Sequence, residues 1–184
     1  MNQSVRRVVT GHNEKGRSVI LFDGPAPNAV PYPPGSGGCF TKLWATDGAP
    51  ACNHGSYDNG DGPISIEPLP QGSGFFIAHI PPSETRELGV ELTRMEREKM
   101  REGMKTIGAE NSGVESERDP SMHRTRTIDY LIILTGEVTL VLDEGEVVLK
   151  PFDVVVQRGT SHAWRNTGST EAIMAGVMLD AEPV

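Results

Sequence analysis

Three side chains between positions 123 and 162 could together bind a divalent metal: His123, Asp129 and His162. Neutral imidazole nitrogens suit Fe, Zn, Ni or Cu, and a carboxylate adds the negative charge that holds a divalent ion. Two histidines and one carboxylate, with coordination positions left open, form the ligand set of non-haem Fe(II) oxygenases. We therefore expect a metal site that prefers Fe(II), with Mn, Ni or Zn as alternatives. The competing interpretation is a degenerate site, in which both histidines are only hydrogen-bonded.

The spacing of these residues limits how the chain can bring them together. Asp129 follows His123 by six positions, which on one straight strand is about 20 Å. A shared site therefore requires the chain to reverse near Arg124–Thr127. His162 can join the other two only if the sheet curls into a barrel, whose interior can hold one small ligand.

The runs around these residues are rich in Ile, Val, Leu, Thr and Tyr and are bounded by Gly and Asp, which favours short antiparallel strands. The run from Glu137 alternates in polarity, which predicts one better-buried face. The Pro/Gly-rich segment 23–38 can be neither helix nor central strand, and 48–72 reads as loop. The expected strands are 5–11, 18–23, 39–47, the run FFIAHIPP, 128–134, 137–143, 146–149, 153–157, 162–166 and 172–179.

Two motifs resemble those of the cupin superfamily. The first cupin motif reads H-x-H-x3-E with a Gly seven residues later, and the second ends P-x-G-x2-H-x3-N. The matching positions here are His123, Thr125, Asp129 and Gly136, then Gln157, Gly159, His162 and Asn166. The resemblance implies an all-β fold, a single jelly-roll barrel, with metal held by His123, Asp129 and His162. Thr125 stands where the family has its second histidine, so we expect it to face the cavity without ligating.

The resemblance places the whole chain, 1–184, in one cupin domain. Strands occupy 1–82, a helical insertion 83–119 and the motif-bearing core 120–184. The insertion is rich in Glu, Arg, Lys, Met and Leu, and it predicts a helix from about Glu87 to Ile107. Leu92, Met95, Met104 and Ile107 fit one face of that helix only roughly. It is either a surface or dimer-contact helix or a lid over the barrel mouth.

Two further residues could contact a ligand. If Phe75, Ile77 and His79 point inward, His79 lines the cavity as a fourth ligand, a general base or a satisfied core histidine. Trp164 shares strand parity with His162, so it is either a flat wall for an aromatic substrate or ordinary core.

Composition excludes several classes of partner. The net charge is −8 and the pI about 5.1, which disfavours nucleic acid and anionic membranes. There is no apolar run of membrane-spanning length and no apolar signal core, so we expect a cytoplasmic protein with Cys39 and Cys52 reduced. We expect a homodimer as well, because the N-terminal strand would otherwise leave an exposed edge.

The runs VVTGHNEKGRSVILFDGPAPN and DVVVQRGTSHAWRN resemble a subgroup of small stand-alone cupins, several of them beside fungal polyketide synthases and described as oxidoreductases. This resemblance implies a metal-dependent, dioxygenase-like oxidoreductase of secondary metabolism, acting on a small aromatic or polyketide-derived molecule. Two alternatives stay open. One is a metal-assisted lyase or decarboxylase with His79 as base, and the other is a non-catalytic small-molecule-binding module.

Overall fold

The computed structural model describes residues 4–83 and 94–183, and within them the chain is mostly β. This confirms the all-β class predicted from the sequence. The elements are β1 Arg6–His12, β2 Ser18–Pro25, β3 Asn28–Pro31, β4 Cys39–Thr46, β5 Ser73–Ile80, α1 Arg94–Thr106, β6 Thr127–Thr135, β7 Val138–Leu142, β8 Glu146–Leu149, β9 Val154–Arg158, β10 His162–Arg165 and β11 Ala172–Asp180. The strands expected from position 128 onward differ from these by at most one residue at each end.

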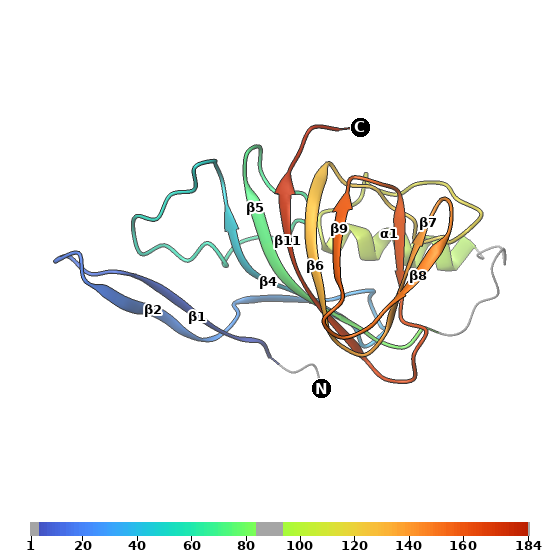
Figure 1. Ribbon diagram of the computed structural model, residues 1–184, viewed down its shortest axis with the longest axis horizontal. Helices are drawn as coiled ribbons and strands as arrows, with labels where there is room; N and C mark the ends of the chain where they lie inside the picture. Colours follow the sequence, from blue (N-terminus) through green and yellow to red (C-terminus); the bar gives the residue numbers. More distant parts are fainter. Residues whose placement is uncertain (1–3, 84–93, 184) are drawn as a thin grey trace.

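Two antiparallel sheets enclose the core. One has six strands in the order β3-β4-β5-β11-β6-β9, and the other has three in the order β10-β7-β8. Leu131, Ile133 and Met174 of the first sheet and Val138 and Leu140 of the second belong to one buried cluster. Figure 1 shows β4, β5, β11, β6 and β9 side by side, with α1 beyond them in that view.

Strand β7 is buried on both faces, so the prediction of one better-buried face was wrong. Val138 and Leu140 pack into the main core, whereas Val141 packs with Met122 and Ala163 in a second cluster. The second face is covered because the segment before β6 lies over it, with the Val114 amide bonded to the Met122 carbonyl. The sequence run alone does not reveal this distant cover.

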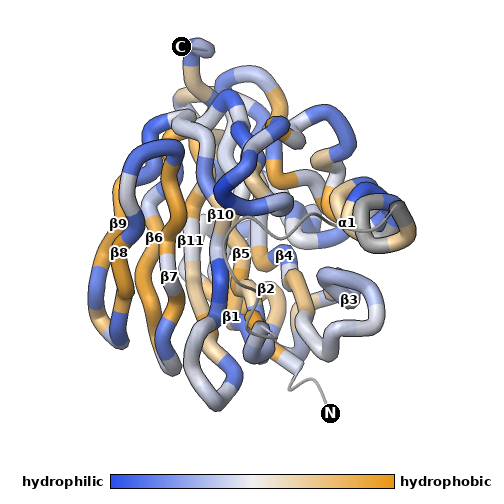
Figure 2. The backbone as a smooth tube through the Cα atoms, turned by 90° about the vertical axis from the view of Figure 1, so that its right-hand side faces the viewer, coloured by the Kyte–Doolittle hydropathy of each residue, from blue (hydrophilic) through white to orange (hydrophobic). Residues whose placement is uncertain are grey.

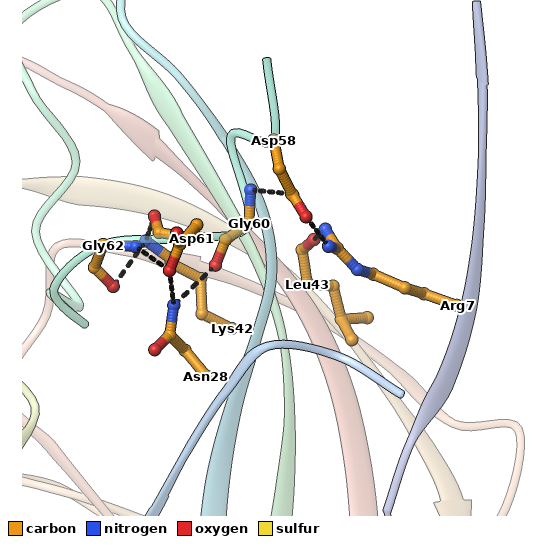
Figure 3. A network of polar contacts seen from close by, with 8 residues as sticks. All are labelled: Arg7, Asn28, Lys42, Leu43, Asp58, Gly60, Asp61 and Gly62. Carbon is orange, nitrogen blue, oxygen red and sulfur yellow. Dashed lines mark hydrogen bonds and ion pairs between the residues drawn. The ribbon is translucent and has the colours of Figure 1, made fainter. Parts of the chain in front are cut away.

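The first two strands form a hairpin, β1–β2, that stands away from the barrel (Figure 1). None of its residues is buried. The guanidinium of Arg7 anchors it by donating to the Leu43 carbonyl at 2.8 Å and pairing with Asp58 (Figure 3). We call residues 4–25 the arm.

Beside this anchor, the ammonium of Lys42 donates to the carbonyl oxygens of Asp61 and Gly62 at 2.7 and 3.2 Å (Figure 3). It also donates to the Pro63 carbonyl at 3.0 Å. This fixes the loop after β4 against the sheet. The Pro/Gly-rich segment contributes β3, which is an edge strand and therefore tolerates prolines.

Helix α1 is shorter than the predicted one in its described part, since 87–93, including Leu92, lies outside the described residues. Met104 and Ile107 are buried, whereas Met95 is 64% exposed and does not share their face. Among the described residues, no helix is long and apolar enough to cross a membrane.

Candidate functional site

A cavity of about 1070 Å³ lies between the sheets and the segments that cover them. Its wall includes residues of both sheets, of α1 and of the loop that precedes β6. Five of the six predicted site residues line it, namely His79, His123, Asp129, His162 and Trp164. Its volume suits a small organic molecule.

Backbone hydrogen bonds hold His123 and His162 beside each other. Each donates its amide to the other's carbonyl at 2.9 Å, forming an isolated antiparallel bridge. The two imidazole centroids are 4.3 Å apart. Between His123 and Asp129 the chain passes through a bend at Arg126 and enters the six-stranded sheet. The two motifs are thus joined by main-chain hydrogen bonds before any side chain contributes.

The hydrogen bonds of both rings fix which nitrogen is free. His123 Nδ1 lies 3.0 Å from the Ser121 carbonyl, and His162 Nδ1 lies 2.9 Å from the Thr160 carbonyl. Because a carbonyl oxygen can only accept, each Nδ1 carries the proton and each Nε2 keeps its lone pair. The Gln157 amide nitrogen, 3.2 Å from His162 Nδ1, therefore does not donate to this ring, and it donates to Thr160 instead. A ring nitrogen tied in this way to a backbone carbonyl is the usual support of a metal-ligating histidine.

Burial keeps both imidazoles neutral. It lowers the pKa of His123, and it lowers the pKa of His162 to about 3, with the neighbouring His123 adding to the effect. Neutral imidazole is the form that binds metal.

Asp129 is buried on the inner face of β6, and its Oδ1 has no hydrogen-bond partner. Burial raises the pKa of its carboxyl to about 6, while a hydrogen bond from Thr127 acts in the opposite direction. A buried carboxylate oxygen without a partner costs free energy unless a cation or a donor satisfies it.

Thr125 is buried, but the cavity is not lined by it. Its hydroxyl lies 2.7 Å from that of Thr127, which in turn bonds Asp129. Thr125 therefore supports the carboxylate through Thr127. Sequence reasoning missed Thr127, although it follows Thr125 and precedes Asp129 at strand spacing.

The donor set fits a metal only in part. Two imidazoles with free Nε2 atoms and an unsatisfied buried carboxylate are suitable donors. In the parts of the chain that the structure describes, however, no three His, Cys, Asp or Glu side chains are grouped closely enough to hold one ion. The three-ligand arrangement therefore stays a prediction.

His79 lines the cavity, but its alternate neighbours Phe75 and Ile77 do not. Phe76, Ala78 and Ile80 of β5 line the cavity, whereas Phe75 is 42% exposed. The assumption that Phe75 and Ile77 point inward with His79 was wrong. His79 is buried, and its Nδ1 lies 3.1 Å from Glu171 Oε2.

The remaining motif residues have structural partners. Trp164 packs edge-on to His162, with ring centroids 5.5 Å apart. Asn166 donates to the carbonyls of Ile80 and Thr170 and so ties two backbone segments together. Arg126 pairs with Glu67, and Arg165 pairs with Asp119.

With this geometry in view, comparison with known families identifies the class. Residues 113–179 match the family model described as "Cupin domain", which covers both histidines and Asp129. The chain therefore carries a cupin domain over these residues.

Similar proteins come from fungi. Phomopsin biosynthesis cluster protein C' of Diaporthe leptostromiformis is 54% identical over 65 residues, 34% of each chain. Oryzines biosynthesis cluster protein J of Aspergillus oryzae is 44% identical over 68 residues, 36% of this chain and 38% of that one. Cupin-domain-containing oxidoreductase virC of Hypocrea virens is 40% identical over 67 residues, 34% of each. The matches span about a third of the length of these curated relatives.

Among solved structures, the Schizosaccharomyces pombe Cnp3 cupin domain aligns over 95% of this chain and 87% of its own, with 10% identity and a TM-score of 0.46. A Cupin 2 conserved barrel domain protein from Salinispora arenicola aligns over 59% of this chain and 64% of its own, with 19% identity and a TM-score of 0.36.

Proposed function

We propose that this protein is a metal-dependent cupin oxidoreductase of fungal-type secondary metabolism that acts on a small aromatic or polyketide-derived molecule. The observation that carries the proposal is the histidine pair. His162 is buried and His123 is half-buried, and both have Nδ1 bound to a carbonyl, which leaves two free Nε2 atoms beside one cavity. The printed names of the similar fungal proteins support the oxidoreductase class and the biosynthetic context.

In this proposal His123 and His162 hold the ion, and Asp129 supplies the third ligand or a charge beside it. A bound divalent ion would supply Lewis acidity and, if it is iron, redox chemistry with O₂. The unpartnered Oδ1 of Asp129 supports a cationic neighbour. Thr127 orients the carboxylate, and Thr125 orients Thr127.

The cavity wall supports a flat, largely apolar substrate. Phe40 and Phe76 stack with centroids 4.7 Å apart, and Trp164 adds a further ring. Met174 and Met178 also line the cavity and can adapt to irregular shapes. A pocket of apolar walls with a few polar groups is the usual form of a small-molecule site.

Metal content tests the proposal directly. The purified chain, reconstituted anaerobically with Fe(II), Mn(II), Ni(II) or Zn(II), should retain one equivalent of one of these ions after desalting, measured by elemental mass spectrometry. His123→Ala and His162→Ala should lose it. His12→Ala is the matched control, because His12 is exposed at the end of β1. A wild-type chain that retains no ion would leave only the non-catalytic binding module.

A metal-assisted lyase is the second candidate, favoured by one observation. His79 lines the same cavity, and Glu171 is placed to orient its ring as it would a general base. Oxygen uptake separates the two candidates. Consumption of O₂ with a hydroxylated aromatic substrate supports the oxidoreductase, whereas product formation without O₂ supports the lyase and makes His79→Gln inactive.

A further inference from the structure

The segment 113–122, which we call the strap, covers the second face of the three-stranded sheet. It comes after α1 in the chain and leads directly to His123 at the candidate site. Its Met122 packs with Val141 of β7 and Ala163 of β10. In the view of Figure 2, β10 lies between β7 and α1. The strap is therefore packed against the same strand that carries the second motif.

Asp119 is a buried charged residue of the strap, and strand β10 holds it in place. Its side chain is 9% exposed, and its Oδ2 lies 2.8 Å from Nε of Arg165 as an ion pair. The Arg165 guanidinium also lies 3.7 Å from the carboxylate of Glu146. Arg165 follows His162 by three positions on β10. Asp119 is thus fixed to the strand that carries one of the two histidines.

Both peptide groups that flank the Cα atom of Ser121 are bonded to Asp119. The Oδ1 atom of Asp119 accepts from the Ser121 amide at 2.8 Å and from the Ser121 hydroxyl. The carbonyl of Asp119 accepts from the Met122 amide at 3.2 Å. Because the peptide unit is planar, the Met122 amide and the Ser121 carbonyl lie in one plane. Asp119 therefore sets the direction in which the Ser121 carbonyl points.

The Ser121 carbonyl in turn orients the His123 ring, since it lies 3.0 Å from His123 Nδ1. A neutral imidazole can carry its proton on either nitrogen, and only the tautomer with Nδ1–H leaves Nε2 free to bind a metal. His162 obtains its support elsewhere, from the Thr160 carbonyl at 2.9 Å. A change at Asp119 should therefore reach His123 but not His162.

We propose that Asp119 is a positioning residue of the candidate site, which acts through Ser121 to set the tautomer and the direction of the His123 ring. This role requires an acceptor oxygen at a fixed place in the turn and does not require a charge. Asn can supply the same oxygen, whereas Glu keeps the charge but carries its oxygens one methylene further out. The consequence for metal binding rests on the function proposed above, whereas the tautomer is a property of the metal-free chain.

Two-bond proton–nitrogen correlation spectra of the metal-free full chain at pH 7 report the tautomer of each histidine. In wild type, His123 and His162 should both carry the proton on Nδ1. Asp119→Glu should convert His123 to a mixture of both tautomers and leave His162 unchanged. Asp119→Ala should give the same mixture, so either variant decides the test. Asp119→Asn should keep the single His123 tautomer, because its amide oxygen still accepts from the Ser121 amide.

Arg118→Gln is the matched control, because Arg118 fastens the same strap through Glu146 and the Gly145 carbonyl. It removes an ion pair but keeps the turn at Asp119, so the His123 tautomer should not change. Far-UV circular dichroism checks the folding of each variant. A single unchanged tautomer in Asp119→Glu and Asp119→Ala, or an equal change in Arg118→Gln, would overturn the proposal. A mixture in Asp119→Asn but not in Asp119→Glu would overturn it as well, because charge would then be the decisive property.

Calorimetric titration with Zn(II) gives a second readout. Asp119→Glu should weaken Zn(II) binding about 10- to 100-fold, which is the usual loss when the support of a metal ligand is removed. Asp119→Asn should bind Zn(II) as tightly as Arg118→Gln does. If the wild type binds none of Fe(II), Mn(II), Ni(II) and Zn(II), the proposed function fails, while the tautomer spectra still decide the role of Asp119. Weaker Zn(II) binding by Asp119→Glu with an unchanged His123 tautomer would overturn the positioning role alone.

Discussion

The two faces of the sheet at β6 invert the usual distribution of polarity. On the inner face the aligned residues are Met178, Asp129 and Gln157, of which two are polar and buried. On the outer face, one position along, they are Val177, Tyr130 and Val156. An antiparallel sheet with one solvated face ordinarily places apolar residues inside and polar residues outside.

The inversion is local, and this is what makes it informative. Further along the same strands, Leu131 and Ile133 are buried apolar residues of an ordinary core. A buried carboxylate and an exposed apolar row each cost stability or solubility, and natural proteins concentrate such departures at functional positions. The inner face thus marks the candidate site.

The largest effect is expected from the histidine pair. His162→Ala should reduce metal affinity and activity by more than about 100-fold, since even the supports of metal ligands cost 10- to 100-fold when removed. Isothermal titration with the preferred ion and a turnover assay measure the two losses. Trp164→Phe, which keeps an aromatic wall, should retain metal binding. Full metal affinity in His162→Ala would show that the ring is only a core residue.

The next largest effect is expected from substitution of Asp129, which should stabilise the metal-free protein. Its carboxyl has a folded-state pKa of about 6, above the ordinary value of 3.8. A raised acid pKa means that the folded state binds the proton more tightly, so stability is lost as pH rises from about 3.8 to about 6. Asp129→Asn should therefore stabilise the metal-free protein at pH 7 by roughly 3 kcal/mol at most.

Urea unfolding of chelator-treated protein at pH 7 and pH 4 checks this. The gain of Asp129→Asn should be present at pH 7 and should shrink to about 0.5 kcal/mol at pH 4, where the folded-state carboxyl is protonated and the unfolded-state carboxyl is about half protonated. The exposed Asp153→Asn is the control. A gain that does not change with pH would show that Asp129 is not destabilised by its charge.

Much of the fold could be predicted from the sequence, because strand runs and turn residues act locally. The bounds of β6–β11 were predicted to within one residue, and the second motif was placed beside the first. The apolar outer face of β6 and β9 was not predicted, although the sequence pattern that indicates it was present. In YLIIL and VVVQ both parities are apolar, which indicates a strand covered on both faces.

The side-chain detail of the site could not be predicted in the same way. The run FFIAHI is apolar at almost every position, so its parity cannot be read from alternation, and the inward set came out as Phe76 and Ala78. Spacing also places the Cα atoms of His123 and Asp129 in one barrel without fixing their side-chain rotamers. Convergence of three ligand atoms depends on those rotamers.

A smaller effect is expected from the hydroxyl pair behind Asp129. Thr127→Val keeps the shape of the side chain but removes the hydrogen bond to Asp129, so the pKa of that carboxyl should rise further. It should also leave the Thr125 hydroxyl without its partner, at a cost of about 1–3 kcal/mol. Thr125→Val should cost stability but change the pKa of Asp129 less. NMR titration of the Asp129 carboxyl carbon separates the two variants. Equal changes in the Asp129 pKa would contradict an arrangement in which Thr127 bonds Asp129 directly and Thr125 acts only through Thr127.

The smallest effect compares two adjacent residues on opposite faces of β9. Val155 packs against the core, whereas Val154 is 64% exposed. Val155→Thr buries a hydroxyl and should cost about 1–3 kcal/mol of unfolding free energy. Val154→Thr should stay within about 0.5 kcal/mol, because its hydroxyl remains in water. Urea unfolding measures both. Equal costs would mean that the outer face is as buried as the inner one within a single chain.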